Sequence, residues 1–312
     1  MTELQAPTDA RTHGPRSLRL LDPVLLSAIH DLELVARVAV EGALSGLHRS
    51  PFHGYSAEFS QYRHYRPGDD LKYVDWKLFA RTDRVYTKQF RETTNVRVQL
   101  VLDASGSMAY RAAIGSSKLD YARLIAAALA HLVVSQGDAA GLIVHDDEIR
   151  TYVGARGGRT HLRALLAVLA NVAPHGTTAS ARALRRSVDL LRSRGVVILI
   201  SDLYDDEDGV DAELRRAARI GHDVAVFHVL TPDEFNLPRG GPTQFEDAET
   251  GETVLAGSTA AREYGSRMAA FLQRWRDRCA SHAIDYCVVR TDAPLDGALR
   301  AYLLGRLSRP RR

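Results

Sequence analysis

Short runs of apolar residues alternate along most of the chain with longer segments in which apolar residues recur every three or four positions. Continuous short runs are typical of buried strands, and the longer spacing is typical of helices with one apolar face. The pattern predicts strands at 96–103, 138–145, 148–153, 195–202, 223–229 and 285–289, and helices at 119–135, 161–171, 180–194, 212–220, 260–281 and 295–306. Because strands and helices alternate, we expect an α/β fold with a doubly wound, mainly parallel sheet.

The rest of the chain has other patterns. Apolar residues at helical spacing predict a further helix over 23–44, and residues 243–255 have the pattern of a hairpin. Residues 1–21 are polar and lack the apolar stretch of a signal peptide, so we expect them to be disordered. The predicted organisation is a disordered lead (1–21), a helix with an aromatic and charged extension (22–95), the α/β domain (96–306) and a basic tail (307–312).

The extension is rich in rings and charges. Ten of the twenty-two aromatic residues lie between Phe52 and Phe90, among closely spaced acidic and basic residues. We favour a structural plug, in which the rings pack on the sheet and the charges pair around the turn at Pro67. The alternatives are an acid/base or phosphate site and a partner-binding surface, since Arg, Tyr and Trp are frequent at binding hot spots. The residues concerned are Arg63, Tyr65, Asp69, Asp70, Asp75, Trp76 and Arg81.

A carboxylate and two hydroxyls follow the apolar run at 96–103: Asp103, Ser105 and Ser107, spaced by two residues. In an open α/β sheet, ligands bind outside the carboxyl ends of the strands. A carboxylate with neutral hydroxyls suits a hard divalent cation that keeps positions open for water or a partner's oxygen. The alternative for Ser105 is that it only caps the helix that follows.

A second strand, 195–202, ends in Asp202, and the turn at Gly176 opens a helix with two threonines, Thr177 and Thr178. If the two strands are neighbours, both carboxylates and one of these hydroxyls converge. We favour Thr177 because it directly follows the glycine, although either threonine could instead cap the helix. The alternative for Asp202 is a turn residue before the acidic loop at 204–208.

The set formed by Asp103, Ser105, Ser107, Thr177 and Asp202 resembles the metal-ion-dependent adhesion site of von Willebrand factor A domains. One position departs from the pattern, because many such domains have glycine after the last aspartate and this chain has Leu203. The resemblance implies that Mg²⁺, or Mn²⁺ or Ca²⁺, is held directly or through water. A Glu or Asp from a client protein would then complete the coordination shell.

A second resemblance covers roughly residues 25–305. The strings that carry it are Gly54-x-x-x-Glu58-Phe59, Arg63-x-Tyr65-x-x-Gly68-Asp69-Asp70, Val74-Asp75-Trp76, Ala80-Arg81, Ser201-Asp202 and Phe245-x-Asp-x-Glu-x-Gly251. In this order they resemble the bacterial family called domain of unknown function 58. The resemblance implies a von Willebrand A-like domain that works with a MoxR-type AAA+ ATPase in chaperone-like assembly or maturation of other proteins.

Most enzyme classes are disfavoured by the motifs. The chain has no Gly-x-Ser-x-Gly elbow, no phosphate-binding Gly-x4-Gly-Lys-Ser/Thr loop and no His-Glu-x-x-His. Asp103 superficially resembles the nucleophile of haloacid-dehalogenase-type phosphatases, but those enzymes need a carboxylate two residues later, where this chain has Ser105. We therefore expect a non-enzymatic module. A Mg²⁺-dependent phosphate-ester hydrolase using Asp103 is the alternative, and His145 or His175 could approach its site.

Composition narrows the partners and the compartment. The net charge is only +3, and the arginine-rich helix at 180–194 has no interleaved aromatics, so a nucleic-acid partner is not expected. No apolar run is long enough to span a bilayer. Cys279 and Cys287 have no metal-binding spacing and are expected to be free thiols, which favours a reducing, cytoplasmic setting.

Overall fold

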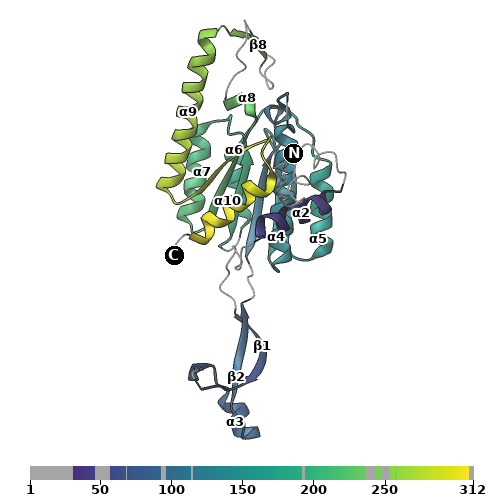
Figure 1. Cartoon of the computed structure of the whole chain (residues 1–312), viewed down its shortest axis with the longest axis vertical. Coiled ribbons are helices and arrows are strands. Elements are labelled where there is room, and N and C mark those ends of the chain that lie inside the picture. Colours follow the sequence, from purple (N-terminus) through teal and green to yellow (C-terminus); the bar gives the residue numbers. More distant parts are fainter. Residues whose placement is uncertain are drawn as a thin grey trace, which may run out of the picture.

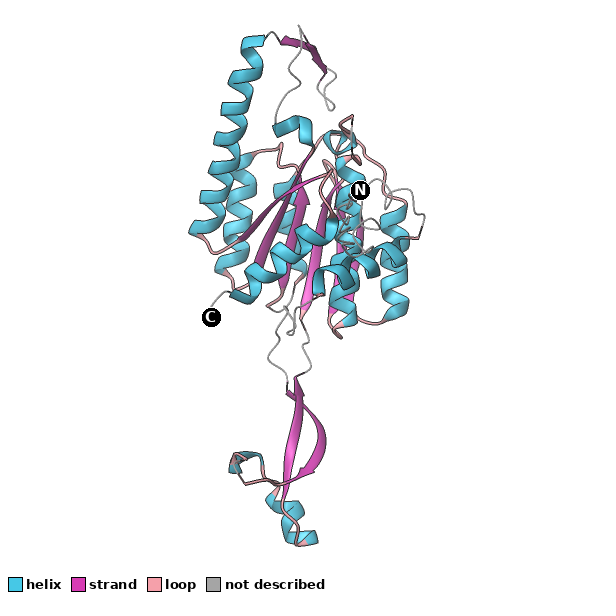
Figure 2. Ribbon diagram, in the orientation of Figure 1, coloured by secondary structure: helices cyan, strands magenta, loops and turns pink. Residues whose placement is uncertain are grey.

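A six-stranded sheet covered by helices on both faces forms the body of the molecule (Figures 1 and 2). The computed structural model describes residues 31–45, 57–67, 69–92, 96–113, 115–191, 194–235, 243–246, 253–256 and 258–308. The predicted lead (1–21) and the first part of the helix expected at 23–44 lie outside the described residues.

The strand order of the sheet is β10-β7-β6-β3-β4-β5. The strands are β3 (Arg97–Asp103), β4 (Ala139–His145), β5 (Ile149–Arg156), β6 (Val196–Ser201), β7 (Asp223–Leu230) and β10 (Asp285–Arg290). Neighbouring strands run parallel except for β4 and the edge strand β5, which pair antiparallel. From β3 the chain moves first to β4 on one side and later to β6 on the other. This order confirms the predicted doubly wound, mainly parallel sheet.

Two helical layers bury the sheet. The helices are α2 (Leu32–Leu44), α4 (Lys118–Ser135), α5 (Arg159–Ala170), α6 (Ser180–Leu190), α7 (Glu207–Arg219), α8 (Pro232–Phe235), α9 (Ser258–Ser281) and α10 (Leu295–Ser308), with a 3-10 turn at Gly106–Ala109. Helices α2, α4, α5 and α10 share one apolar core with the sheet, whereas α6, α7 and α9 share a second core on its other face. Alternation along β3 divides its side chains accordingly: Leu100 and Leu102 face the first core, and Val101 faces the second.

Helix α2 belongs to the body. The carboxylate of Asp31 caps it by accepting the backbone N–H groups of Glu33 and Leu34. Its apolar stripe, which includes Val35, Ala36 and Ala39, is buried in the same core as α4. In the sequence this helix was grouped with the aromatic extension, but in the structure it completes one helical layer.

The aromatic extension forms an arm. Strands β1 (Ala57–His64) and β2 (Tyr86–Glu92) pair antiparallel, and a 3-10 turn (Leu71–Tyr73) and the helix α3 (Trp76–Thr82) lie between them. Because β2 ends just before β3 begins, the arm joins the sheet at the amino end of β3. Figure 1 shows the arm extending beyond the amino ends of the parallel strands. A second, smaller hairpin, β8 (Thr243–Glu246) with β9 (Thr253–Ala256), lies where the sequence pattern placed one.

The predicted packing of the arm's rings on the sheet is wrong. The side chain of Trp76 is 59% exposed, and Tyr62 and Tyr73 are also exposed. The described rings contact one another instead: Trp76 meets Phe79 edge-on at 6.3 Å, and Tyr86 lies 6.2 Å from Tyr62. A two-stranded arm with one short helix has no second layer under which to bury all its rings.

The expected pairing of charges around the turn at Pro67 is present in the described part of the arm, although the pairs are not fully buried. Arg63 and Asp69 form a half-buried pair at 2.8 Å, while Asp70 and Lys72 pair in the open. Arg81 is exposed and makes no ion pair with any described residue. The charges therefore order the arm locally.

Two smaller expectations concern the thiols and the membrane. Cys279 is buried and Cys287 half-buried, and neither is in a disulfide. Among the described helices, none combines the length and the apolar character needed to cross a membrane.

Candidate metal site

The candidate site lies at the carboxyl ends of β3 and β6, which are adjacent and parallel. Asp103 is the last residue of β3, and Ser201 is the last residue of β6, directly before Asp202. Continuous apolar runs bury both strands on two faces, so their polar ends come together at one edge of the sheet. The side chains of Asp103, Ser201 and Asp202 are fully buried.

Asp103 is the centre of this cluster. Its Oδ1 accepts the backbone N–H of Ser105 at 2.9 Å, and its Oδ2 accepts the hydroxyls of Ser201 at 2.6 Å and Thr178 at 3.4 Å. Burial raises the pKa of Asp103, and the nearby Asp202 carboxylate raises it further, against the lowering effect of His145. Asp103 makes no ion pair with a described Lys or Arg, so its negative charge is balanced only by hydrogen bonds and by the nearby imidazole.

The hydroxyls of Ser105 and Ser107 lie 3.1 Å from each other, in the loop whose Ser105 N–H bonds to this carboxylate. Two backbone hydrogen bonds tie their loop to the turn before α6: Gly106 N–H to Gly176 C=O and His175 N–H to Ala104 C=O, both at 2.8 Å. Ser105 also precedes the 3-10 turn, but its side chain makes no capping hydrogen bond there. Its hydroxyl therefore belongs to the polar cluster.

The threonine at the site is Thr178. Thr178 is half-buried and donates to Asp103, whereas Thr177 is exposed and makes no hydrogen bond among the described residues. The preference for Thr177 in the sequence analysis is therefore corrected. Gly176 explains the shift: its φ of +63° is left-handed, so the chain turns there and the second residue after the glycine faces the carboxylate.

Asp202 faces a lysine side chain, whereas the sequence analysis expected it to face the metal site. Its Oδ2 accepts from Nζ of Lys118 at 2.6 Å, and the same ammonium donates to Oε1 of Glu234 at 2.8 Å. Lys118, the first residue of α4, is only 2% exposed. Burial alone would lower the pKa of Lys118, but the two carboxylates outweigh it and raise that pKa. Asp202 thus lies next to the cluster around Asp103 but is held by a permanent cation.

The turn after Asp202 keeps the geometry that glycine usually provides. Leu203 has a φ of +57°, in the left-handed region, and its side chain is buried. Its N–H donates to the Ser201 hydroxyl at 2.9 Å, which in turn donates to Asp103. The departure from the Asp-Gly pattern therefore changes the residue but not the turn.

The donor set fits a hard divalent cation. One buried carboxylate and three hydroxyls, those of Ser105, Ser107 and Thr178, supply only oxygen, which is the ligand type that Mg²⁺ binds in proteins. The described residues contain no group of three or more His, Cys, Asp or Glu side chains arranged for a metal, so a site rich in carboxylates or imidazoles is not present among them. A cation here would depend on hydroxyls, water and one strong anionic ligand.

Several residues of the site were not predicted. Lys118 and Glu234 carried no motif, and a lysine at a helix start is normally expected to be exposed. Ser201 appeared only in the Ser201-Asp202 string of the family resemblance and was not given a role at the site. His145, which the sequence analysis named as a residue that could approach the site, ends β4 directly opposite Asp103 and is fully buried, and its Nε2 has no hydrogen-bond partner among the described residues. The strand register was the signal for His145, since parallel neighbours β3 and β4 end at the same level. His175, by contrast, is an exposed loop residue.

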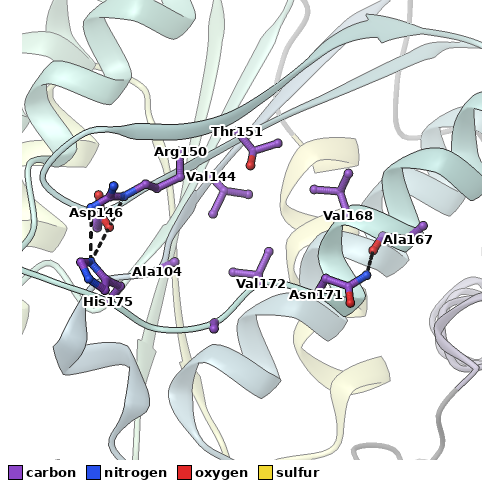
Figure 3. Close-up of a pocket in the computed structure, with 11 residues that line it drawn as sticks. Ala104, Val144, Asp146, Arg150, Thr151, Ala167, Val168, Asn171, Val172 and His175 are labelled. Atoms are coloured by element: carbon purple, nitrogen blue, oxygen red, sulfur yellow. Dashed lines mark hydrogen bonds and ion pairs between the residues drawn. The ribbon is translucent and has the colours of Figure 1, made fainter.

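A cavity of about 660 Å³ opens beside the cluster (Figure 3). Its floor is apolar, with Val144, Val168 and Val172 directed into it, and Ala104, the residue after Asp103 in the chain, also lines it. A polar group closes one side, where Arg150 bonds to the Asp146 carboxylate at 2.6 Å and His175 lies 3.4 Å from it. The cavity could accept an aliphatic side chain from a molecule that also reaches the cluster. The residues that line it are Ala104, Val144, Asp146, Arg150, Thr151, Ala167, Val168, Asn171, Val172, Ala173 and His175.

The fold and the site together define an α/β protein with an oxygen-rich cluster at the switch point of a doubly wound sheet. The family described as "Protein of unknown function DUF58" matches residues 61–272. The chain belongs to this family, as the sequence motifs predicted. The uncharacterised proteins Rv1480 of Mycobacterium tuberculosis and Mb1516 of Mycobacterium bovis are each 34% identical to it over 259 residues, which cover 80% of this chain and 79% of each relative.

Solved structures offer more distant likenesses. The hypothetical protein BatB from Bacteroides thetaiotaomicron aligns with 69% of this chain and 100% of its own, at 19% identity and a TM-score of 0.48. The SpRpn10 VWA domain aligns with 66% of this chain and 94% of its own, at 10% identity and a TM-score of 0.42. At these scores the strand order described above, and not the neighbours, establishes the fold class.

Proposed function

We propose that this protein is a metal-dependent protein-interaction module and not an enzyme. The observation that supports it is the fully buried Asp103 carboxylate, which has hydroxyl donors around it but no ion-pair partner among the described Lys and Arg side chains. A divalent cation would supply the missing charge. The residues that would hold it are Asp103, Ser105, Ser107 and Thr178. The carboxylate of the adjacent Asp202 would add negative charge next to this group.

The cation we propose is Mg²⁺, with Mn²⁺ and Ca²⁺ as substitutes. Neutral hydroxyls contribute little charge, so affinity for the free ion should be weak, of millimolar order, and positions should stay open. A carboxylate from a partner protein is the ligand that such a shell lacks. Binding of metal and partner should therefore strengthen each other, because each affinity rises by the same factor.

The adjacent cavity suggests the kind of segment that is bound. Ala104, the residue after Asp103 in the chain, lines the cavity whose apolar floor is formed by Val144, Val168 and Val172. A segment with Asp or Glu beside an aliphatic residue would match both parts. We propose that the client presents such a segment. Following the family resemblance, we also propose that a MoxR-type AAA+ ATPase acts with this protein in chaperone-like assembly or maturation of the client.

The phosphate-ester hydrolase alternative gains nothing from the geometry. A nucleophilic Asp103 would need access to its substrate, but its side chain is fully buried and accepts three hydrogen bonds. The position where phosphatases of that type carry a general acid is occupied by Ser105, whose hydroxyl contacts only Ser107 among the described side chains.

Calorimetric titration with Mg²⁺ and Mn²⁺ tests the metal site. Asp103→Asn and Ser107→Ala should each abolish or strongly weaken binding, and circular dichroism should show that both variants fold. Ser135→Ala is the matched control, because it removes a hydroxyl that only bonds to Leu132 C=O at the end of α4. Unchanged binding in Asp103→Asn would overturn the assignment.

A pull-down from the native host, with and without chelator, tests the interaction. Client capture should need the metal and should be lost in Asp103→Asn but not in Ser135→Ala. Capture that is indifferent to both chelator and variant would contradict metal dependence, and turnover of an aryl phosphate lost in Asp103→Asn would favour the hydrolase.

A further inference from the structure

Helix α3 presents an outer face that nothing in the described structure covers. Trp76, Lys77, Ala80 and Arg81 are all exposed, and their spacing of one, three and four residues places them on one side of the helix. Leu78 and Phe79 are half-buried and lie on the other side of the helix. The indole of Trp76 is 59% exposed and lies beside two exposed cations on this short helix.

Two of the acidic groups near this face, Asp75 and Asp69, are used within the arm, whereas Asp83 at the C-cap of α3 is exposed. Asp75 caps α3 by accepting the N–H groups of Lys77 and Leu78, and it also accepts the hydroxyl of Tyr62 at 2.8 Å. Asp69 accepts from the Arg63 guanidinium at 2.8 Å and from the Arg66 N–H at 2.9 Å. These carboxylates are thereby directed to the arm's own donors, and they hold the short helix in place.

The two cations of the outer face, and Arg84 just after the C-cap of α3, have no such partners. Lys77, Arg81 and Arg84 are exposed and form no ion pair with any described residue, whereas Lys72 is paired with Asp70. The surface formed by Trp76, Lys77, Arg81 and Arg84, which we call the tip surface, therefore combines net positive charge with one large ring.

We propose that the tip surface docks onto an acidic protein surface that has a recess for the Trp76 ring. Trp and Arg are the residues that most often carry the energy of protein interfaces, and a rigid pair of them on one helix face suits that role. Three cations are fewer than the six to ten phosphate contacts typical of a nucleic-acid site. One ring on a seven-residue helix also offers little area for insertion into lipid.

This partner is distinct from the client of the metal site. The arm joins the amino end of β3, whereas Asp103 lies at its carboxyl end. The two surfaces therefore lie at opposite ends of the strands (Figure 1). Both partners can therefore be bound at once. The docking of the arm does not depend on the metal, and its test separates it from the function proposed above.

The first experiment places a photo-crosslinking amino acid at Ala80, which lies within the tip surface but removes none of its four side chains. Tyr152 on β5, an exposed aromatic residue of the body, is the matched control position. In host cells, crosslinking at Ala80 should yield a protein adduct that Tyr152 does not yield. An adduct with lipid or nucleic acid, or none above the control, would overturn the proposal.

The second experiment uses the purified crosslinked protein and the full-length chain. Trp76→Ala should weaken its binding by about 30-fold or more, the loss expected of a hot spot. Lys77→Glu with Arg81→Glu should also weaken it, and salt should lower the affinity. Equal affinity in Trp76→Ala and the parent would overturn the docking surface.

Two further variants serve as controls. Arg159→Glu with Arg186→Glu makes the same change of charge at exposed cations of the body that form no ion pair with any described residue, and it should bind like the parent. Asp103→Asn should bind this partner normally even if it has lost the metal. A loss in Asp103→Asn equal to that in the tip variants would show that the two surfaces are one site and would contradict the proposal.

Discussion

Lys118→Met would remove the buried cation beside the candidate metal site and test how much of the stability of this end of the sheet depends on it. Nζ lies 2.6 Å from Asp202 and 2.8 Å from Glu234, and the lysine side chain is 2% exposed. Methionine fills much of the same volume, so the main loss is electrostatic. Removing one partner of a buried ion pair costs about 3–5 kcal/mol, because a charge is left buried and unpaired. At about 2–4 °C per kcal/mol, the melting temperature should fall by roughly 6–20 °C.

The cause can be isolated with a second substitution. Asp202→Asn in the Lys118→Met background removes the stranded charge, so the double variant should regain at least half of the lost free energy of unfolding. Glu234 should need no such repair, since its Oε2 already accepts the N–H and hydroxyl of Thr231.

Urea denaturation followed by circular dichroism, in chelator to exclude metal binding, gives the four free energies of this double-mutant cycle. Two results would refute the reasoning. One is a free energy of unfolding for Lys118→Met that is within about 1 kcal/mol of the parent's value, because the loss would then be below the range expected for a broken buried ion pair. The other is a double variant no more stable than Lys118→Met, which would mean that the lysine acts through packing and not through its charge.

Three other measurements follow from the structure. Trp76→Ala should change the free energy of unfolding by less than about 1 kcal/mol, whereas Trp275→Ala, which removes a fully buried ring, should cost about 3–5 kcal/mol; equal thermal melts would contradict this. Burial lowers the pKa of His228 from 6.5 to about 4, so stability present above pH 6.5 should fall by about 3 kcal/mol as the pH drops to 4. In urea denaturation, the free energy of unfolding of His228→Phe should fall less between pH 6.5 and 4 than that of the parent. An equal fall in the two proteins would refute this role of His228. Ala167→Trp should fill the cavity and weaken client capture, and calorimetry should show unchanged Mg²⁺ binding. Ala170→Trp on the same helix should leave both the cavity and client capture unchanged. Equal capture by the two variants would contradict a role for the cavity.

The body of the fold could be read from the sequence because its strands are buried on both faces. Such strands appear as continuous apolar runs, and the runs ending at Asp103 and Asp202 proved to be the neighbours β3 and β6. Neighbouring parallel strands end together, so the meeting of Asp103 with the end of β6 followed from the pattern. The metal itself remains a prediction.

Long-range partners could not be read in the same way. Lys118 and Glu234 are separated by more than a hundred residues, and only the folded chain brings both to Asp202. The choice between Thr177 and Thr178 depended on one dihedral angle at Gly176, which no composition or spacing reveals.

The arm was misjudged for a physical reason. Rings are usually buried because their removal from water is favourable, and the ten aromatics suggested packing on the sheet. Nothing in the sequence showed that β1 and β2 would pair with each other as an arm attached at the start of β3 and leave Trp76 exposed.

Leu203 has a consequence for how relatives of this protein can be found. A search string that demands glycine after the aspartate would discard this chain, although its backbone makes the left-handed turn and still hydrogen-bonds the Ser201 hydroxyl. A leucine in that conformation carries a penalty of about 1–2 kcal/mol, which burial of its side chain can offset. Relatives can therefore carry an apolar residue at this position if its side chain packs beneath the turn. The site is better defined by the left-handed backbone conformation at this position than by the identity of the residue.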